Sequence, residues 1–348
     1  MDKLVHLAHM RETVANDACP AVRIPPMMSH QSAIVDVIIA VWNNARTIER
    51  AVRSAASDPT VSRVIVVDDR SSDGTPDVVD ALMRDLGDRI ILDRLHRNAG
   101  PVAARNRGIS LSHAPWIAIL DGDDYFRPDR IRSLLAASDG ADFIADDHIQ
   151  VREGEEEGPA SSGNLLLGLE APLTLNLETF VAGNISRRGH LRKEYGFLKP
   201  VMRRAFLDQH RLRYDETLRL GEDFALYARV LAAGAVFRVI PSGTYVSVVR
   251  SGSLSDNHTK NDLERLRDSD RSLEQLPRLT QREREIIRAH RESIDARVQW
   301  LNVIDAVKSR NLRAFLSPFF IRWTTSVDLS GKLLEQVVVR AMKMMGLS

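Results

Sequence analysis

Residues 64–76 read VIVVDDRSSDGTP and contain three kinds of local structure. The uncharged, β-branched run at residues 64–67 predicts a buried strand, and the polar residues that follow it predict a loop. Thr75-Pro76-Asp77 then predicts the start of a helix, because a hydroxyl cap, a proline at the first helical position and an early acid each favour a helix N-terminus. We therefore expect a strand–loop–helix unit.

The same alternation continues on both sides of this unit. Three further apolar runs predict strands: residues 37–41, 90–95 and 116–120. Three segments have apolar residues at helical spacing: residues 48–55, 78–86 and 102–111. Together they predict an α/β fold with a mostly parallel, twisted sheet covered by helices on both faces. Ligands of such sheets bind beyond the carboxyl ends of the strands, which points to the residues after Val41, Val67 and Leu120.

The rest of the chain extends this unit at both ends. Residues 1–33 show no sustained period and include an Ile-Pro-Pro sequence, so we expect a flexible arm. Residues 34–258 are expected to form the main domain, with a first half at 34–125 and a second half at 126–258. Residues 259–348 are expected to form a helical C-terminal extension.

Secondary structure in the second half is predicted from local patterns. A polar, Gly- and Glu-rich segment at residues 154–163 predicts an exposed loop. Two helices and two strands are expected after it: residues 200–210, 222–233, 236–240 and 244–249. Thr280 and Glu283 have the spacing of a capping box, which predicts a long helix beginning there.

Composition excludes several classes of protein. Lys and Arg total 48 against 47 Asp and Glu, and this net charge of +1 predicts no bulk affinity for nucleic acid. A single cysteine, Cys19, excludes an internal disulfide, and a reducing cytoplasm is the simplest location. The longest uncharged run, residues 108–120, has 13 residues, whereas a membrane-spanning helix needs about 20 apolar residues. We expect a cytoplasmic protein without a secretory signal.

Two acidic pairs lie beside predicted helices. Asp68 and Asp69 follow a predicted strand and suit polar recognition of a base or a ribose, or they simply form turns and caps. Glu222 and Asp223 begin a predicted helix, where the helix dipole favours acids. Asp223 is alternatively a general base, because a carboxylate ionised at neutral pH can accept a proton from a hydroxyl nucleophile.

A third acidic cluster follows the predicted strand at residues 116–120. Asp121 and Asp123 flank a glycine, and carboxylates at this spacing can converge on Mg²⁺ or Mn²⁺. The alternative is an acidic turn before a helix that begins at Pro128. The position at a strand end favours a site.

As a set, these segments resemble the family-two nucleotide-sugar glycosyltransferases, which have the glycosyltransferase A-type fold. The matching segments are VIIAVWNN at 37–44, VVDDRSSDGT at 66–75, NAGPVAARNRG at 98–108, LDGDD at 120–124, GED at 221–223 and VRSGSLS at 249–255. The resemblance covers residues 34–258 in unbroken order. The second half, with GFLKP at residues 196–200, looks most like bacterial exopolysaccharide glucosyltransferases of the succinoglycan type.

The resemblance implies a role for individual positions. It implies substrate binding by ten residues: Ala40, Trp42, Asn44, Asp68, Asp69, Arg105, Asp121, Glu222, Arg250 and Ser253. Within this set, Asp69 with its neighbour would recognise uracil, Arg105 would approach the donor, and Asp121 would contact the ribose or the sugar. Asp123 would bind the Mg²⁺ or Mn²⁺ that bridges the diphosphate, and Asp223 would be the catalytic base.

The sequence departs from the family pattern after Val249. Some relatives have a histidine there that completes the metal site, whereas here Arg250 is followed by Ser251. Arg250 and the loop that contains Ser253 would instead lie near the diphosphate, where a cation neutralises the charge of the leaving group. A solvated loop residue is the alternative for Arg250, and it is the favoured interpretation of His258, the nearest histidine.

The resemblance therefore predicts an inverting glycosyltransferase that moves a hexose, taken as glucose, from a UDP-sugar to a lipid-linked saccharide. The product would belong to an exopolysaccharide or a cell-surface glycan. A sugar-nucleotide pyrophosphorylase is an alternative, but it would need a glycine-rich, basic loop where residues 40–45 offer Trp and Asn. A non-catalytic nucleotide-sugar-binding protein is the other alternative, disfavoured because both Asp123 and Asp223 are present.

The C-terminal helices allow two interpretations. Residues 301–348 carry 7 cations and 3 acids among many apolar residues. This pattern suits helices that lie in a membrane interface, on the cytoplasmic face of the inner membrane, with cations toward anionic headgroups. The alternative is helices packed on the catalytic domain or on a partner subunit of a homo-oligomer.

Overall fold

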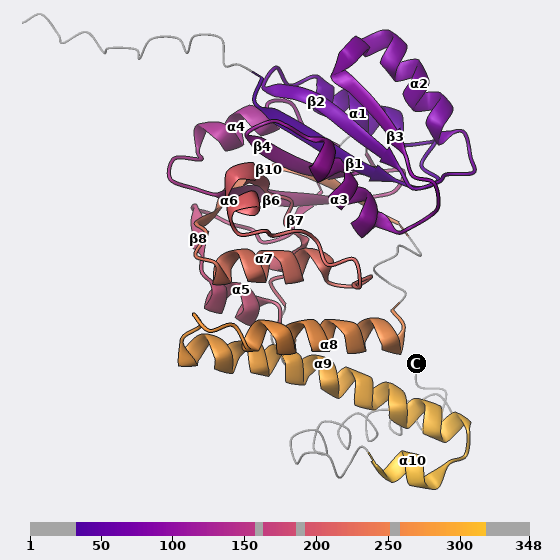
Figure 1. Cartoon of the computed structure of the whole chain (residues 1–348), viewed down its shortest axis with the longest axis vertical. Helices are drawn as coiled ribbons and strands as arrows, with labels where there is room; N and C mark the ends of the chain where they lie inside the picture. The colour runs from indigo at the N-terminus through magenta and orange to yellow at the C-terminus, as the bar shows by residue number, and fades with distance from the viewer. Residues whose placement is uncertain (1–32, 157–162, 186–191, 251–257, 318–348) are drawn as a thin grey trace, which may run out of the picture. The chain divides into compact units, whose positions relative to one another are not determined.

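The computed structural model describes residues 33–156, 163–185, 192–250 and 258–317. The arm expected at residues 1–33 lies outside this part of the chain, apart from its last residue. The described residues form one mixed sheet with helices on both faces (Figure 1).

The first half of the sheet consists of the predicted strand–loop–helix units. Its strands are parallel, in the order β3-β2-β1-β4. They are β1 (Val35–Val41), β2 (Val61–Asp68), β3 (Ile90–Arg94) and β4 (Trp116–Asp121). The helices between them are α1 (Ile48–Ala56), α2 (Thr75–Leu86) and α3 (Pro101–Leu111). A 3₁₀ turn at Gly87–Arg89 precedes β3.

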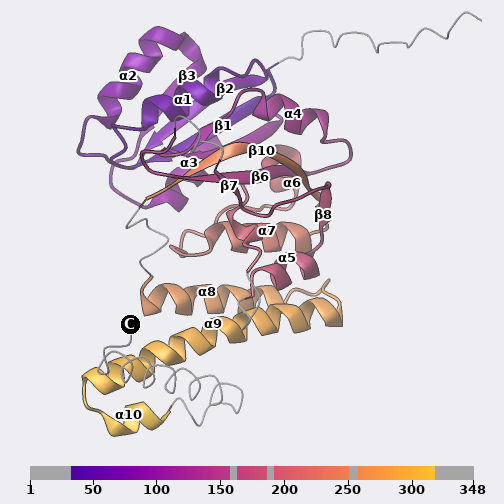
Figure 2. The same ribbon diagram turned by 180° about the vertical axis from the view of Figure 1, so that it is seen from behind.

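Alternate residues of β1 enter two separate cores, because successive side chains of a strand point to opposite faces. Val37 and Ile39 pack with α1, α2 and α4 (Arg130–Ala136). Ile38 joins the other core, with α3, α5 (Leu177–Gly183) and α7 (Glu222–Ala232). Gly108 permits α3 to lie this close, since a Cβ there would overlap the Ile38 side chain. Figure 2 shows the same two helical layers from behind.

The second half of the sheet is attached through a short central strand. β9 (Val201–Arg203) pairs antiparallel with both β4 and β6 (Phe143–Arg152). β6 and β10 (Phe237–Val249) then form the longest ladder, which is parallel. Three short strands pair antiparallel with this ladder: β5 (Tyr125–Phe126) and β8 (Leu173–Leu175) with β10, and β7 (Asn164–Leu165) with β6. The long ladders are therefore parallel, as predicted, although the whole sheet is mixed.

Two predictions for the second half are wrong in detail. Residues 201–203 are the strand β9, and the helix predicted at 200–210 is limited to α6 (Arg204–Gln209). This segment fills the position between β4 and β6, so strand pairing outweighs its helical pattern. The strands predicted at 236–240 and 244–249 are one strand, β10, whose register is irregular between Ile240 and Tyr245.

The predicted start of α2 is also corrected. Gly74, not Thr75, is the N-cap residue, and Thr75 is already helical. The Thr75 hydroxyl donates to the Asp73 carboxylate and accepts the backbone N–H of Asn44. It is therefore unavailable as a cap, because it ties the start of α2 to the loop after β1.

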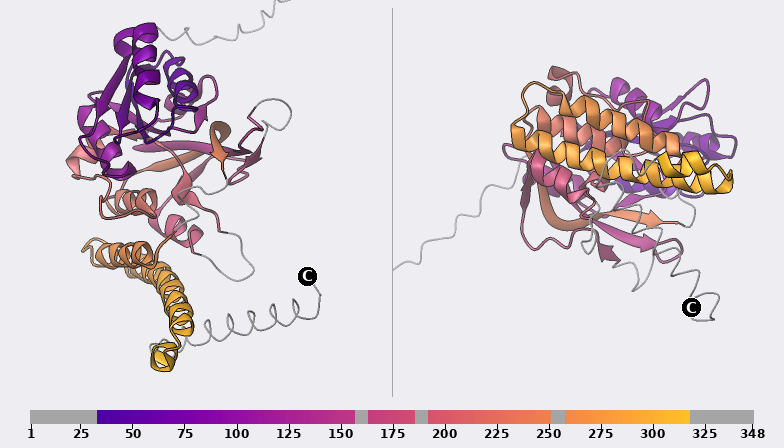
Figure 3. Two further views of the ribbon diagram at one scale, coloured as in Figure 1. Left: turned by 90° about the vertical axis from the view of Figure 1, so that its right-hand side faces the viewer. Right: turned by 90° about the horizontal axis from the view of Figure 1, so that it is seen from below.

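The C-terminal helices pack on the sheet domain. α8 (Lys260–Glu274) lies beside α9 (Gln281–Lys308), and α10 (Leu312–Leu316) follows (Figure 3). α8 contacts α7 and α9 contacts α5. The capping box at Thr280 and Glu283 is confirmed. Within the ranges described, no helix has the length and apolar character needed to cross a bilayer.

Candidate active site

The loops that follow β1, β2 and β4 are bonded to one another at the carboxyl edge of the sheet. The backbone N–H of Asn44 donates to Thr75 Oγ1 at 2.9 Å. Thr47 Oγ1 donates to the carbonyl oxygen of Gly122 at 2.8 Å. The three loops in which the sequence placed its candidate residues are therefore neighbours in space.

The residues predicted to line the nucleotide pocket lie at the end of β1 and just beyond it. Ala40 is the register partner of Asp121 in β4. Trp42 is 52% exposed, which leaves a large aromatic surface open to a planar ligand. The Asn44 side chain bonds to Thr47, which orders the loop. Binding of a nucleotide by these three residues stays a prediction.

Asp68 and Asp69 are both buried and bonded within the protein. Asp68 accepts the N–H of Ser71 and pairs with Arg94 at 3.0 Å. Asp69 accepts the backbone N–H groups of Ala99 and Gly100 at 2.7 and 2.8 Å. These bonds give both acids a structural role at the loops, as the simpler interpretation expected, and a uracil contact stays a prediction.

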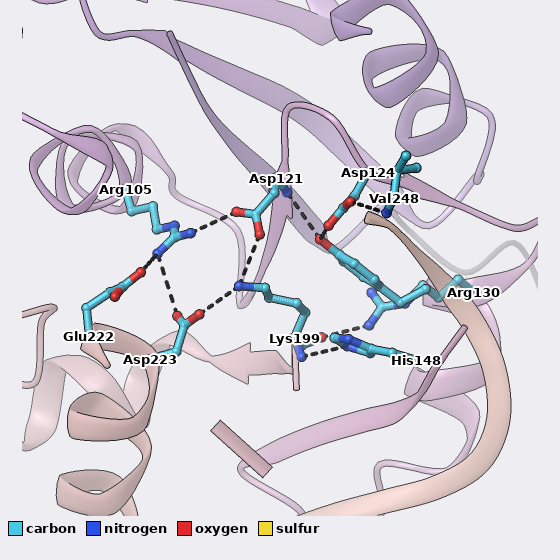
Figure 4. A network of polar contacts seen from close by, with 10 residues as sticks. Arg105, Asp121, Asp124, Arg130, His148, Lys199, Glu222, Asp223 and Val248 are labelled. Atoms are coloured by element: carbon cyan, nitrogen blue, oxygen red, sulfur yellow. Dashed lines mark hydrogen bonds and ion pairs between the residues drawn. The ribbon is translucent and has the colours of Figure 1, made fainter. Parts of the chain in front are cut away.

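Five charged residues from distant parts of the chain form a closed network (Figure 4). Arg105 of α3 lies 2.8 Å from Asp121 Oδ1 and 2.8 Å from Glu222 Oε1. Lys199 Nζ lies 3.1 Å from Asp121 Oδ2 and 2.7 Å from Asp223 Oδ2. Arg105 Nη1 closes the ring at 3.7 Å from Asp223 Oδ1. The structure thus brings together four of the predicted site residues, Arg105, Asp121, Glu222 and Asp223, and adds Lys199.

Asp223 stands at the first turn of α7 and is 8% exposed. Its Oδ1 atom is enclosed and makes no hydrogen bond within the described residues. Burial, and then the charge of Asp223, raise the pKa of Tyr214 and of Tyr227 well above the ordinary value, so both phenols are neutral. A buried acceptor oxygen that lacks a hydrogen bond is costly, and such an atom is often found at a functional site.

The electrostatics of the network keep Asp121, Lys199 and Arg105 charged. Burial alone would raise the pKa of Asp121, but Lys199 and Arg105 hold it below its usual range. Burial would lower the pKa of Lys199, but Asp121 and Asp223 raise it instead. Arg105 behaves in the same way beside its three acids, and its pKa is raised. Each charge is therefore stabilised by an opposite neighbour.

The last two acids of the Asp-Gly-Asp-Asp sequence have different surroundings. Asp124 is buried and accepts the Tyr245 hydroxyl and the Val248 N–H, each at 2.8 Å, so it anchors β10. Asp123 faces Arg250, whose Nε lies 3.8 Å from its Oδ2. Burial, and then the charge of Asp121, raise the pKa of Asp123, as is expected of a carboxylate without a strong partner.

The side chains of the site can hold a divalent cation only if oxygens of the substrate supply further metal ligands. No group of three or more His, Cys, Asp or Glu that could hold a metal occurs in the described ranges, and His258 belongs to none. Both oxygens of Asp121 are paired with Arg105 and Lys199. Asp123 remains, and Mg²⁺ is commonly bound by one or two carboxylates together with substrate phosphates. Ser253 lies outside the described residues.

Lys199 of the network and two residues next to it, His148 and Arg130, were not among the predicted site residues. The Lys199 N–H donates to His148 Nε2 at 3.1 Å, and Arg130 Nη2 donates to the Lys199 carbonyl oxygen at 2.7 Å. Only Lys199 had a signal in the sequence, because it lies in the GFLKP segment at residues 196–200. His148 and Arg130 lie in a strand and a helix, without a motif around them.

Comparison with solved structures places the fold among glycosyltransferases. S. aureus TarS 1-349 aligns with a TM-score of 0.59 and 16% identity, over 81% of this chain and 89% of that one. The mannosyltransferase PcManGT from Pyrobaculum calidifontis, solved with GDP-Man and Mn²⁺, aligns with a TM-score of 0.54 and 15% identity, over 88% and 86%. The glycosyltransferase A-type fold is therefore confirmed.

Sequence relatives place the chain more narrowly. Residues 36–208 match the family model described as glycosyl transferase family 2. The succinoglycan biosynthesis protein ExoU of Rhizobium meliloti (strain 1021) is 44% identical over 282 residues, 81% of each chain. ExoO of the same organism is 39% identical over 227 residues, 64% of this chain and 62% of ExoO. The chain belongs to glycosyl transferase family 2, as its motifs predict.

Proposed function

We propose that the chain transfers glucose from UDP-glucose to a hydroxyl group of a lipid-linked saccharide, in exopolysaccharide or cell-surface glycan synthesis. The observation that carries the proposal is the network of Asp121, Lys199 and Asp223 at the carboxyl edge of the sheet. The 44% identity to ExoU, a protein named for succinoglycan biosynthesis, supports the exopolysaccharide. A TarS structure in complex with UDP-GlcNAc, with a TM-score of 0.56, supports a UDP-sugar donor.

The base in this transfer is Asp223. The acceptor hydroxyl attacks the anomeric carbon, its proton passes to the Asp223 carboxylate, and the bond from that carbon to the diphosphate oxygen breaks. One displacement inverts the configuration, and the transition state has oxocarbenium character, as in glycoside hydrolysis. Asp223 suits this role because it begins a packed helix and keeps an oxygen that makes no hydrogen bond in the described part of the chain.

Arg250 and a cation held by Asp123 would stabilise the negative charge on the leaving diphosphate. Arg250 supplies a guanidinium that can hydrogen-bond phosphate oxygens directly. Asp123 lies beside it and would hold the Mg²⁺ or Mn²⁺. When bound, this cation supplies Lewis-acid stabilisation of the departing oxygen. Asp121, whose side chain is 27% exposed, remains accessible to a ribose or sugar hydroxyl.

A lipid-linked acceptor would require the enzyme to work at the cytoplasmic face of the inner membrane. Three apolar side chains are exposed at the end of α9 and in α10: Val307, Leu312 and Leu316. Lys308, Arg310 and Arg313 lie between them in the chain. Apolar residues interleaved with cations suit a peripheral contact with anionic lipid.

A turnover assay tests the proposed function. The full chain is incubated with a panel of UDP-sugars and lipid-linked oligosaccharides, and both UDP release and the lengthened saccharide are measured. UDP release with a β-linked product is expected for UDP-glucose. Formation of UTP and sugar 1-phosphate when pyrophosphate is added to the UDP-sugar would instead identify a pyrophosphorylase, and binding of UDP-sugars without turnover would identify a binding protein.

A further inference from the structure

We infer that Lys199 is a positioning residue for the transfer, one that orients the Asp223 carboxylate and ties it to Asp121. The inference rests on the proposed function, because it assigns Asp223 the role of base. Lys199 does not touch the reacting atoms in this account. It acts through the carboxylate that does.

Asp223 depends on Lys199 for its orientation. The bond from Lys199 Nζ to Asp223 Oδ2, at 2.7 Å, is a short bond between opposite charges. The other nearby cation, Arg105, is 3.7 Å from Oδ1 and is already bonded to Glu222 and Asp121. Without Lys199, the carboxylate would lose its shortest ion pair and keep the longer one to Arg105.

Lys199 is itself held by its backbone, which makes it a suitable anchor. Its N–H donates to His148 Nε2 and its carbonyl oxygen accepts from Arg130, so both backbone groups are bonded. Burial lowers the pKa of His148 to about 3, so this imidazole is neutral and its Nε2 is an acceptor. Arg130 is fixed in turn by Asp146 at 2.7 Å. The anchor thus reaches from the centre of the sheet to the site.

Lys199 also separates two acids that would otherwise repel each other. Its ammonium group bridges Asp121 and Asp223. Without Lys199, Arg105 alone would lie between the two carboxylates, and like charges in one site repel each other. The remaining groups that face Asp223 are Arg105, Tyr214 and Tyr227, and both tyrosines are neutral.

The test compares Lys199→Met, Lys199→Arg and Lys193→Met in the full chain. Lys193 is an exposed lysine of the same connecting segment and serves as the control. The rate is followed over pH with the UDP-sugar that the wild-type enzyme turns over. Binding of that UDP-sugar is measured by calorimetry and folding by thermal unfolding.

Lys199→Met is expected to lower kcat about 10²-fold, within the range of general-base contributions, and to change donor affinity far less. The acidic limb of the pH–rate profile should move to higher pH, because the carboxylate loses the cation that favours its charged form. Lys199→Arg keeps the charge but moves the donor atoms. The acidic limb should therefore stay in place while kcat falls about tenfold or more. Lys193→Met should match the wild type.

A purely structural role for Lys199 would change thermal stability without changing kcat or the pH profile of the folded enzyme. A folded Lys199→Met variant with wild-type kcat and profile would overturn the inference. If Lys199→Met does not fold, Lys199→Arg becomes the test. A wild-type kcat in Lys199→Arg would then overturn the inference. The proposed function fails separately, if the wild-type chain turns over no UDP-sugar.

Discussion

Two buried networks of acids and cations lie next to each other in this protein, and their carboxylates are satisfied to different degrees. Both oxygens of Asp146 are bonded: Oδ1 accepts from Arg130, and Oδ2 accepts from Thr244 and the Tyr245 N–H. In the second network, Asp223 has one bonded oxygen and one without a hydrogen bond in the described part of the chain.

The difference distinguishes a structural ion pair from the network that we propose to be functional. The Arg130 and Asp146 side chains are fully buried, and the guanidinium also stacks over Phe126 at 4.5 Å. Removal of one member of such a pair destabilises the fold, because it leaves a buried charge uncompensated. The second network lies at the carboxyl edge of the sheet and has two cations for three acids, so it retains capacity to bind a ligand or accept a proton.

The largest effect is expected for Asp223→Asn. The amide is nearly isosteric but cannot take up the proton, so transfer should fall 10²–10⁴-fold, roughly 3 to 5 kcal/mol in the barrier. UDP-sugar binding, measured by calorimetry, should stay close to that of the wild type. Near-normal turnover by this variant would remove the distinction between the two networks.

Asp146→Asn is the matching change in the structural network. It leaves Arg130 without its anion, so the free energy of unfolding should fall by about 3–5 kcal/mol at pH 7. Urea unfolding measures this loss, with the exposed Asp139→Asn as control. Turnover per folded molecule should change little compared with Asp223→Asn, and a large loss would show that the networks act as one.

The stability effect of Asp146 has a defined pH dependence. Burial would raise the pKa of Asp146, but Arg130 lowers it below the ordinary value. A lowered pKa gives stability that is present above the unfolded value of about 3.9 and lost as the pH falls through the folded value. The difference between wild type and Asp146→Asn should therefore be full at pH 7 and shrink below about pH 4.

Asp123 should have a smaller effect on rate than Asp223. We expect activity to need a divalent cation, and Asp123→Ala to weaken UDP binding and to lower the rate about 10²-fold, because Lewis-acid stabilisation is worth several kcal/mol. Asp139→Ala is the control. Full turnover by chelator-treated enzyme would contradict the metal role and leave Arg250 as the main charge stabiliser.

The smallest effect concerns the membrane. The full chain should bind anionic liposomes at low salt, and removal of the residues after 308 should abolish binding. Lys308→Gln should weaken binding by about 1 kcal/mol and reduce its salt dependence. If the full-length protein does not bind such liposomes, or if the truncation unfolds it, the role of these helices is structural.

Much of the first half of the fold was predictable because its signals are local. The apolar runs that form β1, β2 and β4 are each buried on both faces, and this burial is visible as an unbroken run of apolar residues. The second half was harder. β6 carries Asp146, Asp147 and His148 in its middle, and such residues do not indicate a buried strand until their partners are known.

By itself the sequence determined the family, the order of the strand–loop–helix units and the identity of the acids at the strand ends. These are properties of residues close together in the chain, where apolar periodicity and motif spacing are sufficient. Only the tertiary structure decided which acids are satisfied and which remain available. Arg105 and Glu222 are 117 positions apart, and Lys199 is 24 positions from Asp223. No local pattern records such distances, because the free energy of a buried charge depends on the partners that folding brings to it.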